Sequence, residues 1–310
     1  MHMRIVPFLL SRDRKGAVQL GQLPGRMISC ILPMPINATR LIRKMRGGAQ
    51  AHLMECDDGN FYVVKFRNNP QHRRILVNEL IASVFLNYLQ IATPEAAIVN
   101  VPSSLLAANP DIHIQLGSRR MAVEPGWHFG SRYPGDPAKV MVYDFIPDLL
   151  LDKVANLDQF LGVLAFDKWI GNADARQSIF YRARLEQWSP SAGERPKQHG
   201  FVARMMDHGY VFDGPHWRFS DSPLQGLYFR PTVYRKATSL DDFQPWLDRV
   251  IHFPEEVVDE ALKQIPPEWL DGDEAPLETL LSNLMARRKR VPDLIQDSQR
   301  GRINPFPHWK

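Results

Sequence analysis

The change in hydrophobic patterning near residue 147 limits the possible folds of this chain more than any other feature. Before it, short stretches rich in β-branched and aromatic residues lie between turn residues, and one helix-like segment interrupts them. After it, most apolar residues recur at helical spacing. The sequence therefore predicts an α+β chain with a small β-rich N-lobe that carries one helix (30–147) and a larger, mostly helical C-lobe (148–297).

The first lobe follows a tail, 1–29, that shows no sustained period and that we expect to be flexible. AQAHLMECDDGNFYVVKFR predicts two strands around a turn at 57–60, because Asp-Gly favours tight hairpin turns. Apolar residues at helical spacing predict a helix over 73–91. Two further stretches, 96–101 and 138–146, have the composition of strands.

The second lobe opens with a helix predicted over 156–170 from the apolar spacing of NLDQFLGVLAFDKWI. A polar turn follows, and then two strand-like stretches, SIFYRARL and FVARMMDHGYVF. From Leu240 onward the spacing predicts three helical segments, the last of which ends near Ile295. Residues 298–310 contain too much proline to continue a helix, so we expect a C-terminal tail.

Charge and cysteine content exclude several functions. The formal net charge of +4 is small against 38 basic and 34 acidic residues, so we expect no direct nucleic-acid binding. Cys30 and Cys56 alone cannot form a metal cluster or a disulfide framework. The early apolar run IVPFLL is shorter than the roughly 7–15 residues of a secretory signal and the about 20 of a spanning helix. We expect no membrane contact and a cytoplasmic location.

Lys65 lies on a predicted strand, on a face that it shares with apolar side chains. A lysine in that position requires an anion, and Glu79 on the following helix is a candidate. The alternatives are an outward-facing lysine and an ordinary solvated glutamate. Upstream, Gly47 and Gly48 could let backbone N–H groups approach phosphates, or they could form a plain turn.

Two aspartates lie in turns at the ends of apolar segments. Asp174 follows the predicted helix in WIGNADARQ, two residues after Asn172, and Asp207 lies in MMDHG, where its oxygens could hold Mg²⁺. Either aspartate could instead form a turn cap or an Asx turn. A lysine and a glutamate in a β-rich first lobe, followed by two turn aspartates in a helical second lobe, is the order used for phosphoryl transfer from ATP.

The chain resembles the HipA-like kinases, bacterial relatives of the protein-kinase and phosphatidylinositol-kinase folds, from about Pro35 to Ile295. INATRLIRKMRGGAQAHLMECDDGNFYVVKF is similar to the opening strands of that family, and ILVNELIASVFLNYL to its Glu-bearing helix. WHFGSRY and IPPEWL resemble segments of the HipA-like branch, and WIGNADARQ its catalytic loop. The resemblance implies a bilobal protein-kinase-like fold.

The resemblance also implies a role for each candidate. Lys65 would contact the ATP phosphates and Glu79 would orient it. Asp174 would be the catalytic base and Asp207 the principal Mg²⁺ ligand. The connector VYDFIP would receive the adenine through backbone groups, and the residues nearest to it would be Tyr143, Asp144 and Phe145.

The sequence departs from the family pattern at two positions. The best-known members carry His two residues after the catalytic Asp and a metal-binding Asn five residues after it, where this chain has Arg176 and Ile179. Isoleucine cannot ligate a metal, so Gln177 and Asn172 are the candidate replacements. Arg176 could donate to a phosphate as a fork.

We therefore expect an enzyme that uses ATP and Mg²⁺, most simply a HipA-like serine/threonine protein kinase that transfers the γ-phosphate to a protein hydroxyl. The alternatives are a nucleotide-binding pseudokinase or scaffold, which Ile179 favours, and a small-molecule kinase on the same fold. The phosphate acceptor, an antitoxin partner and the oligomeric state are not indicated by the sequence.

Overall fold

The structure of the protein is a computed structural model that describes residues 34–185, 188, 199–301 and 304–310. All of them belong to one unit, Leu32–Lys310. The expected tail at 1–29 lies outside the described residues. The described chain is a mixed α+β structure, with strands concentrated before residue 133 and helices after residue 148.

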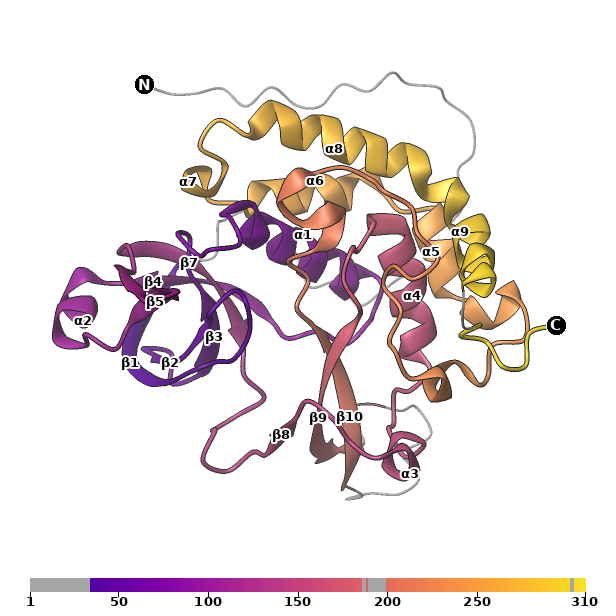
Figure 1. The fold of residues 1–310 in the computed structure, drawn as a ribbon, viewed down its shortest axis with the longest axis horizontal. Coiled ribbons are helices and arrows are strands. Elements are labelled where there is room, and N and C mark those ends of the chain that lie inside the picture. The colour runs from indigo at the N-terminus through magenta and orange to yellow at the C-terminus, as the bar shows by residue number, and fades with distance from the viewer. Residues whose placement is uncertain (1–33, 186–187, 189–198, 302–303) are drawn as a thin grey trace. The chain divides into compact units, whose positions relative to one another are not determined.

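Five strands form a closed barrel, with the order β1 (Ile36–Lys44), β2 (His52–Cys56), β3 (Phe61–Lys65), β7 (Gly126–Arg132) and β4 (Ala96–Val101). Figure 1 shows this barrel in indigo and magenta. The first four strands pair in antiparallel fashion, as do β7 and β4, whereas β4 closes the barrel in parallel with β1. The predicted strands at 52–65 and 96–101 are confirmed, but β7 was not predicted.

Every second side chain of a barrel strand points inward, and these side chains fill the barrel. On β3, Tyr62 and Val64 point into the barrel, where they pack with Met54 and Val99. Phe61, Val63 and Lys65 therefore lie on the outer face of β3. The turn between β2 and β3 contains Gly59 at φ +76°, as the Asp-Gly signal predicts.

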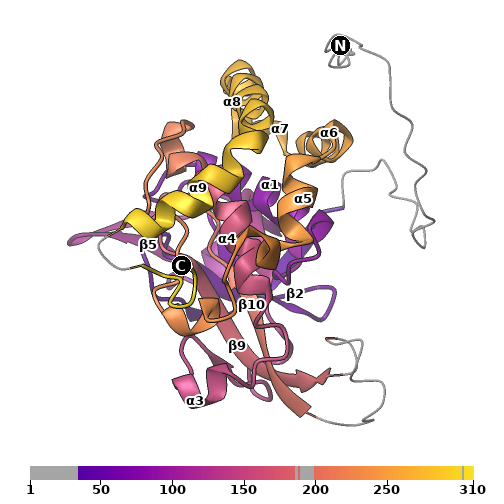
Figure 2. The same cartoon turned by 90° about the vertical axis from the view of Figure 1, so that its right-hand side faces the viewer.

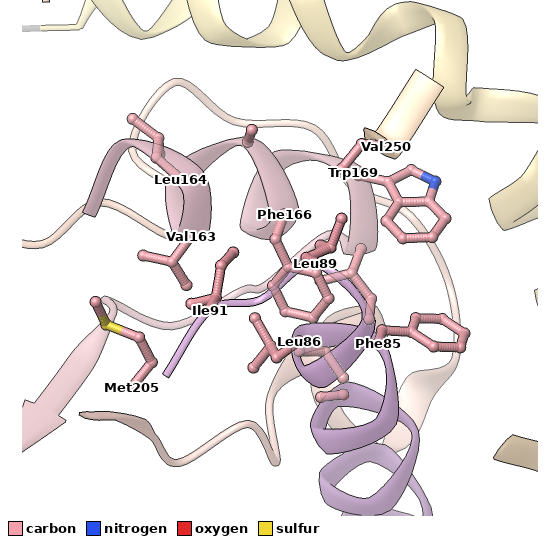
Figure 3. Close-up of a cluster of buried hydrophobic side chains, with 14 of the residues drawn as sticks. Phe85, Leu86, Leu89, Ile91, Val163, Leu164, Phe166, Trp169, Met205 and Val250 are labelled. Atoms are coloured by element: carbon pink, nitrogen blue, oxygen red, sulfur yellow. The ribbon is translucent and has the colours of Figure 1, made fainter. Parts of the chain in front are cut away.

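Helix α1 (Arg74–Tyr88) confirms the helix predicted at 73–91. Most of its residues are buried, because it packs against β4 and β7 and also against the helices that follow residue 210. Figure 3 shows Phe85 and Leu86 of α1 among side chains of α4, and Phe85 stacks on Trp169 with ring centroids 5.6 Å apart. This packing makes α1 the bridge between the barrel and the helical part.

Three further elements of the first half were not predicted: a short helix, α2 (Ser103–Ala108), and a hairpin of β5 (His113–Leu116) and β6 (Arg119–Ala122). The strand predicted at 138–146 is wrong for most of its length. Only β8 (Val142–Tyr143) is a strand, and it pairs with β9 of the second half rather than with the barrel. Strand composition alone does not select a partner.

The second half contains α3 (Asp148–Leu151), α4 (Gln159–Ile170) and the antiparallel strands β9 (Gln177–Arg184) and β10 (His199–Met206). The helix and the two strands predicted here are confirmed within a few residues, although β10 ends at Met206. Helix α4 packs between α5 and α9, as Figure 2 shows. It carries the polar turn at its carboxyl end.

The three segments predicted after Leu240 correspond to five shorter helices. Proline residues divide them: Pro254 precedes the second helix, Pro266 precedes the third, and Pro292 starts the last. These helices are α5 (Trp246–Ile251), α6 (Glu255–Lys263), α7 (Pro267–Leu270), α8 (Glu274–Ala286) and α9 (Val291–Asp297).

The other helical elements of the described residues are short 3₁₀ helices: Val211–His216, Pro231–Tyr234, Leu240–Phe243, Arg287–Arg290 and Ser298–Arg300. Phe306, in the expected C-terminal tail, is buried against Tyr234 and Phe243. Within the described part of the chain, no helix combines the length and apolarity needed to cross a membrane.

Candidate functional site

Lys65, Glu79 and Asp207 meet in one ion triad. The Lys65 ammonium forms an ion pair with Oε1 of Glu79 and another, 2.7 Å long, with Oδ1 of Asp207. The lysine side chain is 11% exposed, whereas the Asp207 side chain is 35% exposed. The triad is therefore buried on the glutamate side and open to solvent on the Asp207 side.

Each member of the triad is held by a different element. Uninterrupted pairing with β2 and β7 fixes β3, which ends at Lys65. Glu79 lies on the buried face of α1. Asp207 follows β10 directly in a left-handed conformation, φ +57°, which turns the chain out of the strand.

The charges of the triad depend on one another. Burial lowers the pKa of Lys65, but the neighbouring carboxylates of Glu79 and Asp207 outweigh it and hold that pKa above its ordinary value. Burial would raise the pKa of Asp207, yet the Lys65 ammonium holds it below its usual range. Burial raises the pKa of Glu79. Near neutral pH the site therefore presents a cation and an ionised, partly exposed carboxylate.

Asp174 lies in the turn after α4 and does not belong to the triad. Gly171 ends the helix at φ +66°, and Asn172 is buried, where its amide donates to Asp167 over 3.1 Å. The Asp174 side chain is exposed and accepts a hydrogen bond of 2.7 Å from the Ala175 N–H. The Gly226 N–H binds the Asp174 carbonyl oxygen, so the turn is fixed while its carboxylate faces solvent.

Arg176 does not present its guanidinium to solvent, which corrects the expectation that it forms a fork to a phosphate. Its side chain and that of Asp167 are both 0% exposed, and they form a bidentate ion pair. Arg176 also donates to the carbonyl oxygen of Met206 over 2.9 Å. The arginine therefore connects the turn to the residue before Asp207.

A hydrogen-bond chain that was not predicted continues from Arg176 to His208. The guanidinium donates to Nδ1 of His208 over 2.9 Å, so the Nε2–H of the neutral ring donates to Thr93 Oγ1, 3.1 Å away. Thr93 in turn donates to the Met205 carbonyl oxygen. Burial, and then the charge of Arg176, hold the pKa of His208 well below its ordinary value. The only sequence signal was the charged pair Asp167-Lys168 inside an apolar helix.

Gln177 and Ile179 follow the turn on β9. Gln177 is exposed, lies opposite Met206 and hydrogen-bonds to Asp207 through its side chain. Ile179 is buried opposite Arg204. Because an ionised carboxylate only accepts, Gln177 donates its amide N–H to Asp207, and the Asp207 carboxylate is the oxygen ligand that the site offers to Mg²⁺. No cluster of three or more His, Cys, Asp or Glu residues suited to a metal occurs among the described residues.

Gly47 and Gly48 form the turn between β1 and β2. Gly47 has φ +117°, which excludes most other residues, and the Gln71 side chain lies where a Cβ on Gly48 would be. The structure thus explains both glycines by local geometry. Among the described residues, no hydrogen bond or ion pair joins this turn to the ion triad.

The connector residues expected near adenine contact the second half of the chain rather than the barrel. Tyr143 belongs to β8, Asp144 is exposed, and Phe145 is 63% exposed with the Arg230 guanidinium 4.4 Å above its ring. None of the three lines the cavity described next.

A cavity of about 610 Å³ lies at the start of β3, where Phe61 lines it; Lys65, at the other end of the strand, and Asp207 do not line it. Tyr133 and Asp136, from the segment after β7, form another wall. Arg204 closes it from β10, on the strand face that also carries Met206, the residue before Asp207. The cavity therefore lies between the barrel and the β9–β10 pair.

Comparison with known proteins confirms the resemblance drawn from the sequence. Residues 38–181 match the family described as HipA-like kinase. The matched residues include Lys65, Glu79 and Asp174 but not Asp207. This match supports a kinase-like phosphotransferase with an unspecified acceptor.

Two solved structures are also similar to the chain. The Golgi casein kinase with Mn/ADP bound has 13% identity over 86% of this chain and 73% of that chain, with a TM-score of 0.44. A second structure of the Golgi casein kinase has 14% identity over 86% of this chain and 72% of that chain, with a TM-score of 0.46. No curated protein sequence matches the chain.

Proposed function

We propose that this protein is a serine/threonine protein kinase that transfers the γ-phosphate of Mg·ATP to a protein hydroxyl. The observation that carries the proposal is the Lys65–Asp207 ion pair, with Glu79 behind it. The ion pair joins a cation suited to phosphate and a carboxylate suited to a metal, from opposite halves of the chain. The family match over residues 38–181 supports the same chemistry.

Phosphoryl transfer passes through a loose transition state, so positioning and charge neutralisation dominate the catalysis. Lys65 would bind phosphate oxygens once a nucleotide arrives, and Glu79 would hold the ammonium in place. Asp207 would hold Mg²⁺, whose positive charge neutralises the β- and γ-phosphate oxygens when it is bound. Because Ile179 replaces the metal-binding Asn that the resemblance implies, we expect this chain to depend on one principal metal site.

The 610 Å³ cavity is the candidate site for the nucleoside end of ATP. Its lining includes Phe61, at the start of β3, and Tyr133, and Lys65 lies at the other end of the same strand. We therefore assign the adenine to the segment after β7 in place of the connector residues 143–145. The nucleotide would then extend along β3 toward Lys65.

Asp174 would accept the proton of the acceptor hydroxyl. Its carboxylate is exposed beside a turn that buried Asn172 and the Gly226 N–H hold in place. An exposed base at a fixed position fits an acceptor that is itself a macromolecule better than an enclosed small molecule.

A nucleotide-binding pseudokinase is the second candidate, and a specific observation favours it: Ile179 is buried at the position where the family has a metal ligand. The test is phosphate transfer from γ-labelled ATP with Mg²⁺ to the protein itself and to cell-lysate proteins. Transfer by the wild type that is lost in Asp207→Asn and Asp174→Ala supports the kinase. Binding of ATP without any transfer supports the pseudokinase, and absence of ATP binding contradicts both.

A further inference from the structure

Asn78, the residue before Glu79 on α1, binds the chain segment that follows Asp207. Its side chain is completely buried. Its amide nitrogen donates to the carbonyl oxygens of Gly209, Val211 and Gly214, at 2.8, 3.1 and 3.0 Å. Its amide oxygen accepts from the indole N–H of Trp217 at 2.8 Å. One side chain thus holds four points of the segment 209–217.

The segment that Asn78 holds has a backbone that most sequences avoid. Phe212, Asp213 and Trp217 have φ values of +59°, +58° and +51°, as does Asp207 itself at +57°. Non-glycine residues seldom adopt this conformation, and they persist in it only where surrounding contacts determine it. The contacts made by Asn78 are of that kind, because they capture the carbonyl oxygens that these turns direct toward α1.

Two neighbours on α1 strengthen the contact. A Cβ on Gly209 would lie 2.6 Å from Cγ2 of Ile75, so the chain after Asp207 passes against the helix at a position that only glycine fits. Arg74 donates to the Pro215 carbonyl oxygen over 2.9 Å, and its guanidinium lies 4.3 Å from the centre of the Trp217 ring. The segment is therefore fixed to about one turn of α1, from Arg74 to Asn78.

We propose that Asn78 is a positioning residue that sets the distance between Glu79 and Asp207. It does so by fastening the chain after Asp207 to the helix that carries Glu79, so that both carboxylates face Lys65. Its consequence for catalysis rests on the proposed kinase function. Its effect on the ion triad does not, and can be measured without a nucleotide.

The first experiment is amide hydrogen exchange on the free full-length chain. The N–H groups of Val211, Asp213 and Gly214 are hydrogen-bonded within the described structure. We expect Asn78→Ala to raise their exchange rates at least about tenfold, because a lost buried hydrogen bond weakens local closure by about that factor. Acylation of Lys65 by a lysine-specific reagent should accelerate in parallel.

The matched control is Asn156→Ala. Asn156 is also buried and also binds a backbone carbonyl oxygen, that of Ala203 at 2.9 Å, but its side-chain hydrogen bonds go to Gln159 and Ala203 and not to α1 or the segment 209–217. It should lower the thermal unfolding midpoint without the exchange and acylation changes. Equal changes in both variants, or no change at 211–214 in Asn78→Ala, would overturn the proposal.

Two further measurements complete the test. If Asn78→Ala does not fold, Trp217→Phe removes the indole donor while keeping an aromatic ring. It should produce the same exchange changes at smaller amplitude, and unchanged exchange would overturn the proposal. In the transfer assay, Asn78→Ala should raise the Mg²⁺ concentration for half-maximal rate about tenfold, whereas Asn156→Ala should not. If the wild type transfers no phosphate, the kinase proposal fails and the exchange result still decides the role of Asn78.

Discussion

Lys65 and Asp207 are 142 residues apart in the sequence, yet their charged groups are 2.7 Å apart in the structure. The lysine comes from the last residue of a barrel strand and the aspartate from the first residue after β10. This ion pair links the barrel of the first half of the chain to the β9–β10 pair of the second half. A nucleotide phosphate that binds Lys65 must therefore displace the Asp207 carboxylate from the lysine or share the lysine with it.

Replacing Asp174 by alanine should abolish transfer and leave the fold intact. We expect the rate to fall at least about a hundredfold, the contribution of a general base, because the carboxylate is exposed beside the site. The free energy of unfolding should change by about 0.5 kcal/mol or less, because the side chain only accepts from the next residue in the described structure. Urea unfolding and the labelled-ATP assay measure the two effects.

The matched control for this substitution is Asp158→Ala, at another exposed aspartate that lies at the start of α4. It should retain the wild-type rate. An Asp174→Ala protein that unfolds easily but still transfers phosphate would mean that the turn has only a structural role.

Replacing Arg176 by methionine should destabilise the protein by about 3–5 kcal/mol, because the buried Asp167 carboxylate would lose its charged partner. Urea unfolding gives this value. The double substitution Asp167→Asn with Arg176→Met should cost less than the sum of the two single changes, since no buried charge is left uncompensated. Strict additivity would show that the two side chains do not depend on each other.

Stability should fall as the pH drops below about 6.5. Burial lowers the pKa of His128 to about 3 and that of His208 well below 6.5, so these rings stay neutral in the folded state while the unfolded chain binds protons near pH 6.5. The unfolded state then binds more protons, and each histidine costs about 1 kcal/mol per pH unit below that point.

Urea midpoints between pH 7.5 and 5.5 test this dependence. His128→Gln should have a shallower acid slope than the wild type, because glutamine does not titrate. An unchanged slope in His128→Gln would contradict the assignment of a neutral buried ring.

Gly162→Ala should destabilise the protein, although alanine normally stabilises a helix interior by about 1 kcal/mol relative to glycine. A Cβ at this position of α4 would lie 2.5 Å from the Trp246 ring of α5, so overpacking should cost about 1–3 kcal/mol. The double variant with Trp246→Leu should be less sensitive to the added methyl group. Thermal unfolding of the wild type, Gly162→Ala, Trp246→Leu and the double variant completes a double-mutant cycle.

Sequence patterns predicted the helices and strands that are determined by residues close together in the chain. The Asp58-Gly59 turn sets the β2–β3 hairpin, and helical spacing sets α1 and α4. Strand β7 escaped prediction because WHFGSRY mixes polar residues and glycine; the structure needs Gly130 there, since a Cβ would clash with Val99 of the neighbouring strand. The same limit explains the incorrect strand at 138–146, whose partner is chosen by packing far along the chain.

The site shows a similar division. The sequence predicted that Lys65 needs an anion and that Glu79 lies on the next helix. The structure places Glu79 and Asp207 beside Lys65. The burial of Arg176 was not readable, because its partner Asp167 lies nine residues away across a turn. A charged residue inside an apolar helix signals that a partner exists but does not identify it.

The most direct test of the account is the crystallographic position of a non-hydrolysable ATP analogue bound with Mg²⁺. The account predicts that the phosphates contact the Lys65 ammonium, that the metal binds Asp207, and that the base enters the cavity lined by Phe61 and Tyr133. A nucleotide bound elsewhere, with the Lys65–Asp207 ion pair undisturbed and no metal on Asp207, would contradict it.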